Sequence, residues 1–363
     1  MMTENSQDIP GLVCPIPLAH DDKIVLGHGS GGKMSQDLIE KTFFPPLDNP
    51  ILRAANDAGI AVIDLPQKNG EKVTCRLAVS TDSHVVNPLF FPGGDIGRLA
   101  ICGTVNDIAM MGAQPSYLTA SFILEEGLNI EILQNVLESM KDSAAESAIQ
   151  IIAGDTKVVE KGKADSLYIN TAGVGILPPG VNIHGANSQP GDIVILSGTI
   201  GDHGIAVLEA RGDLGFKSSI TSDIAPLNGI VQDILKITDQ IHTMRDPTRG
   251  GLATSLNEVA KQSQVCIEIY ETKIPINPAV LSACEMLGFD PLYIANEGKF
   301  LLIVPEVFVE PILQKMKSHR YGQDAVIIGR VRANPKGRVL MRTSIGTTRV
   351  VDILSGELLP RIC

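Results

Sequence analysis

The chain has 363 residues, of which 44% are hydrophobic and 4% aromatic, and its formal net charge at pH 7 is −11. That length is too great for one ordinary domain and suits two. The acidic balance argues against nucleic acid or an anionic membrane surface as a partner, and no apolar run approaches the ~20 residues of a membrane span.

Cysteine usage indicates a reducing compartment. The six cysteines are widely scattered, without a CxxC pair or a Cys/His cluster, which argues against a structural zinc site or a disulfide framework. The first ten residues are polar and acidic, unlike a signal or transit peptide. We therefore expect a cytoplasmic protein.

The first half of the chain alternates predicted helices and strands. After an irregular lead-in and a glycine-rich segment, 28–33, a helix is expected over 35–42. The apolar runs 60–63 and 77–79 indicate two strands of one sheet. The elements expected next are a helix over 93–111 with Asp95 as its cap, a helix over 129–147, a buried strand at 149–152 and a strand over 169–177.

The second half repeats this alternation. Strands are expected at 192–196, 266–270, 299–304, 325–331, 338–342 and 347–352, and helices at 205–210, 224–236, 252–262, 278–287 and 307–319. This pattern predicts an α/β (α+β) class with mixed sheets. The domain organisation expected is an N-terminal extension (1–23), an N-terminal domain (24–180), a C-terminal α/β domain (181–353) and a mobile tail (354–363).

Aspartates recur beside these elements. Asp82 and Asp155 each follow an apolar run, at what we expect to be the carboxyl end of a strand, where ligands gather in open sheets. Singly, each also fits a turn-former. Asp107 lies on an otherwise small, apolar face of its helix, so we expect it to be buried, either paired with Arg98 or Arg245 or bound to a hard cation.

A fourth aspartate, Asp246, stands just before a predicted helix, and Gly250 and Gly251 let the backbone approach a ligand at the helix N-terminus, which favours phosphate. Magnesium takes oxygen ligands and commonly bridges to nucleotide phosphates. Together with Asp57, these residues predict Mg²⁺-nucleotide binding without a Walker loop. In the glycine segment, His28 and Lys33 could close over the phosphates, or the segment could be disordered without ligand.

The sequence ends on Pro360-Arg361-Ile362-Cys363. A cysteine in the last position has no following segment to anchor it in a core. It offers reach and a nucleophilic thiolate that can carry an acyl-type group. The alternative is an exposed cysteine without a role.

Seven segments together resemble the HypE family, the carbamoyl dehydratases of nickel–iron hydrogenase maturation. They are His28–Gly32, Ser80–Ser83, Val105–Ala113, Gly154–Lys157, Gly198–Gly204, Arg245–Gly251 and Pro360–Cys363, and the resemblance spans about residues 24–363. The wider superfamily includes aminoimidazole ribonucleotide synthetase, selenophosphate synthetase and thiamine-monophosphate kinase. It shares the acidic motifs but not the final four residues.

The resemblance implies an N-terminal domain that dimerises through its sheet, with ATP in the cleft between the domains. It implies that Asp82, Asp107, Asp155 and Asp246 bind ATP and Mg²⁺, with Asp57 less securely placed because its neighbour is Asn56. The further nucleotide-binding residues expected are Asn106, Gly250, Gly251, His28 and Lys33. The catalytic residues expected are Cys363, Lys157 and Glu297. The alternatives are that Lys157 is an ordinary surface lysine and that Glu297 forms a structural ion pair.

The implied reaction begins when a HypF-like carbamoyltransferase loads a carbamoyl group onto Cys363. ATP-dependent dehydration of this S-carboxamide then gives a thiocyanate, which supplies cyanide to the iron centre through a HypC/HypD-like iron-carrying complex. Two other readings remain open. One is a selenophosphate synthetase-like phosphotransferase, which would use a cysteine or selenocysteine where this chain has Ser30. The other is a thiol adaptor without enzymatic activity.

Overall fold

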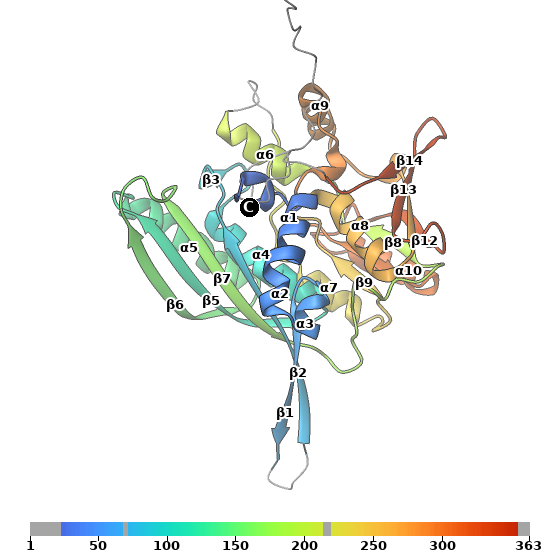
Figure 1. Cartoon of the computed structure of the whole chain (residues 1–363), viewed down its shortest axis with the longest axis horizontal. Coiled ribbons are helices and arrows are strands. Elements are labelled where there is room, and N and C mark those ends of the chain that lie inside the picture. The colour runs from blue at the N-terminus through green and yellow to red at the C-terminus, as the bar shows by residue number, and fades with distance from the viewer. Residues whose placement is uncertain (1–22, 68–71, 213–218, 355–363) are drawn as a thin grey trace, which may run out of the picture.

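The computed structural model describes residues 23–67, 72–212 and 219–354, and it is built around two mixed sheets with helices between and around them (Figure 1). Cys363 and nearly all of the predicted N-terminal extension lie outside these ranges. The strands of the first sheet all precede residue 177, and those of the second all follow residue 192. In the described part of the chain, no helix combines the length and apolarity needed to cross a membrane.

The first sheet has five strands and is covered by helices on one face. Only the pair β5–β6 is parallel. Helix α4 (Ile96–Met110) packs on β2, β5 and β7, and α5 (Ile130–Glu146) packs beside it (Figure 1). The strand order is β1 (Gly59–Pro66), β2 (Lys72–His84), β7 (Leu167–Ile176), β5 (Gln114–Glu125) and β6 (Gln150–Val159).

The second sheet has seven strands and is covered on both faces. In β8 and β11, Ile195 and Leu302 pack into one core, whereas Val194 and Leu301 pack into another on the opposite side. Burial on both faces explains why these strands read as continuous apolar runs. The order is β14 (Thr348–Val351), β13 (Arg338–Arg342), β10 (Cys266–Tyr270), β12 (Val326–Arg332), β8 (Ile193–Leu196), β11 (Leu301–Val304) and β9 (Thr243–Arg245).

The remaining helices surround these sheets. The short N-terminal helices run between the two halves of the molecule (Figure 1). They are α1 (Lys33–Leu38), α2 (Phe44–Leu47) and α3 (Pro50–Arg53). The later helices are α6 (Asp202–Arg211), α7 (Asn228–Leu235), α8 (Gly251–Ser263), α9 (Pro278–Leu287) and α10 (Val309–Lys317). Two short strands, β3 (Phe90–Phe91) and β4 (Gly94–Asp95), pair as an antiparallel ribbon.

The predicted class, α/β with mixed sheets, is confirmed, and two local expectations were wrong. The strand expected to be buried at 149–152 is the edge strand β6, and most of its residues are exposed because no described strand covers its outer side. The helix expected from residue 224 begins only at Asn228, because the backbone N–H groups of Ile224 and Leu227 are bound by the side chains of Ser222 and Asn106. Strands β5 and β9 were not predicted.

The cap of α4 gives a test of local stability. The Asp95 Oδ1 atom accepts the backbone N–H groups of Gly97 and Arg98, at 2.7 and 3.2 Å. Asp95→Ala leaves both donors unsatisfied, so we expect a loss of about 1 kcal/mol in the free energy of unfolding. Urea denaturation measures it, and Asp95→Asn, which keeps a capping oxygen, should recover most of the loss. Equal stability of the alanine variant and the parent would contradict the capping role.

Candidate functional site

Four aspartates from separate elements gather where the two halves of the molecule meet. Asp57 follows α3, Asp82 lies on β2, Asp107 on α4 and Asp246 directly after β9. The charges of Asp246, Asp82 and Asp57 all act on Asp107, as expected only for carboxylates that lie near one another. The structure therefore brings together four of the five aspartates that the sequence singled out.

Strand β2 presents a row of polar side chains to α4. Alternate residues of a strand share a face, and Ala78, Ser80 and His84 are all buried on this one. Ser80 Oγ donates a hydrogen bond to Asp107 Oδ2 at 2.6 Å. Neither arginine offered as a partner for Asp107 contacts it, because Arg98 pairs with Glu146 and Arg245 pairs with Asp57. Within the described residues, Asp107 therefore has no ion pair with either arginine.

Arg245 fixes Asp57 from the second sheet. Its guanidinium lies 2.5 Å from Asp57 Oδ1 and also donates to the Ala55 carbonyl at 2.6 Å. The other oxygen, Asp57 Oδ2, is buried and has no hydrogen-bond partner. An unsatisfied buried carboxylate oxygen is costly, so this atom is available to a ligand.

A cavity of about 250 Å³ opens beside this pair at the start of α8. Its lining includes His28, Asp57, Asp246, Thr254 and Glu258. Gly250 and Gly251 precede or begin the helix in left-handed conformations, with φ of 76° and 61°. A Cβ atom on Gly250 would lie 2.2 Å from Thr254 Oγ1, so only glycine leaves this helix N-terminus open to an anion.

Burial and the charges of neighbouring acids raise the pKa values of Asp107 and Asp246, and burial raises that of Asp57. Burial, followed by the charges of Asp246, Asp82 and Asp57, holds the pKa of Asp107 well above its ordinary range. Burial and the charge of Asp57 do the same to the pKa of Asp246. Asp57 itself has a pKa raised by burial, against the opposing effect of Arg245. A bound cation would relieve this repulsion.

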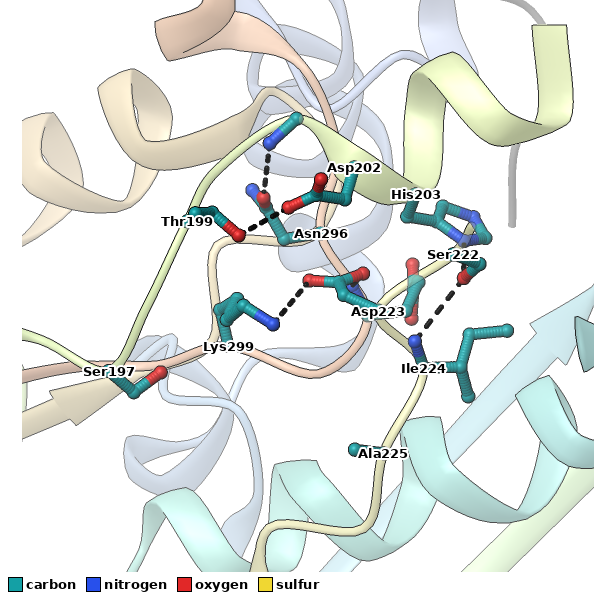
Figure 2. Close-up of polar contacts among 12 residues, drawn as sticks. Ser197, Thr199, Asp202, His203, Ser222, Asp223, Ile224, Ala225, Asn296 and Lys299 are labelled. Carbon is teal, nitrogen blue, oxygen red and sulfur yellow. Dashed lines mark hydrogen bonds and ion pairs between the residues drawn. The ribbon is translucent and has the colours of Figure 1, made fainter. Parts of the chain in front are cut away.

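Glu297 belongs to the same cluster. The residue is 4% exposed, and its Oε1 atom is buried without a hydrogen-bond partner. Burial, and then the charges of Asp82, Asp246 and Asp223, raise its pKa well above the ordinary value. Figure 2 shows the neighbouring loops around Asn296, which carry the pairs Lys299–Asp223 and Thr199–Asp202.

Asn106 clamps the two halves of the molecule together. Its Nδ2 group donates to the carbonyls of Ala225 and Glu297, at 3.0 and 3.3 Å, and its Oδ1 accepts the Leu227 N–H at 2.8 Å. The side chain therefore binds main chain on both sides, and the part in nucleotide binding expected of Asn106 stays a prediction.

Asp155 and Lys157 lie apart from the acid cluster, on strand β6. Asp155 is in the middle of β6 and not at a strand end, so that expectation was wrong. Asp155 lies opposite Ser121 of β5, which in turn lies opposite Asn170 of β7, and this row is on the sheet face away from α4. Asp82 lies opposite the buried Thr171, on the face that α4 covers. The Asp155 side chain is 62% exposed and pairs with Lys157 at 2.7 Å. The sheet separates both residues from the acid cluster of the same chain.

The glycine segment contributes through its backbone. His28 lines the cavity, and its Nδ1 atom accepts the Val25 N–H at 3.0 Å. Lys33 begins α1 and donates its backbone N–H to the carbonyl of Leu354 at 2.8 Å. A Cβ atom on Gly32 would lie 2.4 Å from that carbonyl. This segment therefore joins the cavity wall to the last residue that the structure describes.

Two residues of the site were not found from the sequence. His84 is buried beside Asp82, with 3.6 Å between Nε2 and Oδ2, and neither ring nitrogen has a hydrogen-bond partner. Gly103 of α4 makes room for this pair, since a Cβ there would lie 3.0 Å from the His84 ring. The period of two from Ser80 to His84 was the available signal. Glu258, on α8, is the second such residue: it lines the cavity, and the charge of Arg245 acts on it.

The donor set fits a divalent cation held jointly with a polyphosphate. Within the described ranges, no three His, Cys, Asp or Glu side chains converge closely enough to hold an ion by themselves. Magnesium is usually bound by one or two carboxylates together with substrate phosphates, so a preformed cage is not required. The orphaned Asp57 oxygen and the repulsion around Asp107 are the features such an ion would satisfy.

Comparison with known proteins agrees with this architecture. Residues 56–177 match the N-terminal domain of AIR synthase related proteins, and residues 189–342 match the C-terminal domain. The carbamoyl dehydratase HypE of Cupriavidus necator is 48% identical over 341 residues, which cover 94% of this chain and 95% of that relative. The Escherichia coli carbamoyl dehydratase HypE is 44% identical and is covered over its whole length.

Solved structures give the same result. A HypE–HypF complex contains a chain 48% identical to this one, with a TM-score of 0.81 and coverage of 87% of this chain and 99% of that one. A HypE structure in complex with ATP is 45% identical, with a TM-score of 0.76 and coverage of 94% and 100%. The chain therefore belongs to the AIR synthase related proteins and, within them, to the HypE family of carbamoyl dehydratases.

The crowded acids predict an unusual pH dependence. Because the pKa of Asp107 is raised in the folded state, the folded chain binds more protons than the unfolded chain above the ordinary carboxyl pKa of 3.8. Without metal, stability should therefore fall as pH rises from about 4 towards the raised pKa. Asp107→Asn, which resembles the protonated form, should stabilise the metal-free protein at pH 7 and flatten the profile.

Thermal unfolding at several pH values, with a chelator present, measures this effect. Asp142→Asn is the control, because Asp142 is an exposed acid on the surface of α5. The electrostatic account fails if Asp107→Asn and Asp142→Asn change the profile equally.

Proposed function

We propose that this chain is an ATP-dependent dehydratase that converts an S-carboxamide on its own Cys363 into a thiocyanate, the donor of cyanide to the iron centre of nickel–iron hydrogenase. Membership of the carbamoyl dehydratase family supports the activity. The observation that carries the proposal is the position of Leu354. Its carbonyl accepts the Lys33 N–H at 2.8 Å, and the glycine segment that ends at Lys33 also lines the acidic cavity.

That contact sets where the remaining chain begins. Cys363 is the ninth residue after Leu354, and nine extended residues span at most ~30 Å. Gly31, next to the contact, is pressed against Arg249, since a Cβ there would lie 2.7 Å from the Arg249 Cβ. We propose that a tail of this length carries the sulfur of Cys363 between the acid cluster and a partner's surface.

The chemistry balances with ATP as co-substrate. The carboxamide oxygen attacks the γ-phosphorus of ATP, ADP leaves, and the nitrogen loses one proton. The C–O bond of the resulting O-phosphoryl imidate then breaks as phosphate departs and the second nitrogen proton is lost, which leaves S–C≡N. Phosphorylation is needed because it converts a poor leaving group into a good one.

The acids have separate parts in this reaction. Asp107 and Asp246, with Asp82 and Asp57, would hold Mg²⁺ together with the phosphates, and the ion would neutralise charge on the transferring phosphoryl group. The open N-terminus of α8 faces the cavity from the other side. Glu297 is the proposed acceptor of the nitrogen protons, because its raised pKa and its unpartnered oxygen suit a general base.

A homodimer formed through the first sheet accounts for Asp155 and Lys157. The face opposite α4 exposes large apolar side chains, and β6 adds others at its edge. On the sheet these include Ile63, Leu65, Val79, Tyr117, Ile123 and Ile176. Monomeric proteins rarely leave such a patch uncovered. A second copy seated here would bring Asp155 and Lys157 to the partner's site, where we place the nucleotide contact of Asp155 and the charge-stabilising role of Lys157.

Two further partners follow from the reaction. The carbamoyl group must be transferred to Cys363 by a HypF-like carbamoyltransferase, and the HypE–HypF complex among the similar structures supports this partner. The thiocyanate must be consumed by an iron-carrying complex like HypC and HypD. A domain division at about residue 180, between the two sheets, fits the position of the cleft.

Cys363 gives the most direct test of the proposed function. Cys363→Ala should abolish acceptance of the carbamoyl group and formation of thiocyanate, yet bind nucleotide like the parent, because the cysteine is not part of the acid cluster. Mass spectrometry of the C-terminal peptide, after incubation with the carbamoyltransferase and ATP, should show loss of water from the carbamoylated parent. Cys75→Ser is the matched control, and thiocyanate formed on Cys363→Ala would refute the assignment.

Asp82→Asn tests the nucleotide site. Loss of one of the gathered charges should weaken binding of Mg²⁺ with a non-hydrolysable ATP analogue by tenfold or more, about 1.4 kcal/mol, without preventing carbamoylation of Cys363. Titration calorimetry with and without Mg²⁺ measures the change, and Asp142→Asn serves as control. Unchanged affinity would remove Asp82 from the site.

A further inference from the structure

We propose that Asp223 is the residue that positions Glu297 for proton transfer, by holding the Glu297 backbone N–H with its carboxylate. The proposal rests on the proposed function, in which Glu297 is the base. Asp223 lies in the irregular segment that precedes α7, and Glu297 lies in the turn before β11, so the contact joins two segments about 70 residues apart in the chain.

The contact between the two segments is direct and buried. The Glu297 N–H donates to Asp223 Oδ1 at 3.0 Å, and the Asp223 side chain is 3% exposed. Lys299 approaches the other oxygen, with 3.5 Å between Nζ and Oδ2. A buried carboxylate between a backbone donor and an ammonium group has a narrow range of orientations, which is what a positioning residue requires.

Gly298 lets the segments meet. A Cβ atom there would lie 1.8 Å from the Asp223 carbonyl oxygen and 2.8 Å from the Ala225 backbone nitrogen. The turn that carries Glu297 is thus pressed against the segment that carries Asp223. On its other side, Asn106 holds both the Ala225 and the Glu297 carbonyls. Glu297 is fixed at its N–H and at its carbonyl by different side chains.

The conspicuous motif Gly198–Gly204 supplies the outer support (Figure 2). Gly198 makes room for Lys299, since a Cβ there would lie 3.1 Å from the lysine Cε. The Gly201 N–H donates to Asn296 Oδ1 at 2.7 Å, immediately before Glu297. The Thr199 hydroxyl binds Asp202 at 2.5 Å. This motif has no contact with the acidic cavity in the described chain, and support of the Glu297 turn explains its composition.

Asp223 also contributes charge. The groups that act on the Glu297 carboxyl are Asp82 and Asp246 from the acid cluster, Asp223 from the supporting segment, and Arg249 with opposite sign. Lys299 sits behind Asp223 and balances its charge. An asparagine at position 223 would keep an acceptor for the Glu297 N–H but remove one of the three negative charges.

This difference separates placement from charge in an experiment. The carbamoylated chain is assayed for thiocyanate formation over a range of pH in three forms: the parent, Asp223→Ala and Asp223→Asn. Asp192→Ala is the matched control, because Asp192 is also a buried aspartate that accepts a backbone N–H, from Gln189 at 2.7 Å, but in another part of the second half. Hydrogen exchange of the peptide around Glu297 is measured on the same proteins.

Asp223→Ala should lower kcat by roughly 10²-fold, as expected when a reacting group is misplaced, and leave KM for ATP within about twofold. Asp223→Asn should recover most of kcat and shift the acid limb of the pH profile to lower pH, because the carboxyl of Glu297 ionises more readily. The Glu297 amide should lose protection only in Asp223→Ala. Asp192→Ala should lose stability without a change in kcat.

Unchanged protection of the Glu297 amide in Asp223→Ala would overturn the proposal, whatever the activity. Parental kcat in that variant, or coincident pH profiles for Asp223→Asn and the parent, would do the same. If the parent forms no thiocyanate but Asp223→Ala still loses protection, the proposed function fails and the placement of Glu297 by Asp223 stands.

Discussion

The rest of this structure depends on the concentration of buried negative charge between its two halves. Asp57, Asp107, Asp246 and Glu297 are each held at raised pKa by burial, and the acids repel one another. Asp57 among these four is paired directly with a cation, Arg245. Such an arrangement costs stability in the empty protein, and it becomes favourable when a cation and phosphates enter.

The same constraint explains how the halves are joined. The acids come from both halves, so the distances between them depend on how firmly the two halves are held together. Asn106 ties α4 to the segment 225–227 and to Glu297, Arg245 ties β9 to the end of α3, and Lys33 ties the glycine segment to Leu354. Each tie ends on a backbone atom, which fixes the position of a segment as well as that of a side chain.

Most residues of the site carry a signal in the sequence, and those that were misplaced or missed have identifiable physical reasons. Asp107 was predicted to be buried because the helix face around it is apolar, and Asp246 was assigned to a nucleotide site because two glycines and a helix N-terminus follow it. Asp155 was expected to join them. It instead faces the far side of the sheet, because β6 continues through it to Val159 and the pleat turns it away from α4. Asp223 was missed because its partner, Glu297, is distant in the chain, whereas His84 was missed although it continues the alternation of Ser80 and Asp82 on β2.

The class of fold, most elements and the family can be predicted from the amino-acid sequence, because apolar periodicity, glycines and motif spacing are local properties. The sequence also predicts that carboxylates and a helix N-terminus serve a nucleotide. The folded chain was needed to show which acids gather, that Arg245 pairs with Asp57, and that Asn106 and Asp223 hold the turn of Glu297. Those facts depend on which segments pack together and on which face of a strand a side chain emerges, and neither is encoded over a short stretch of chain.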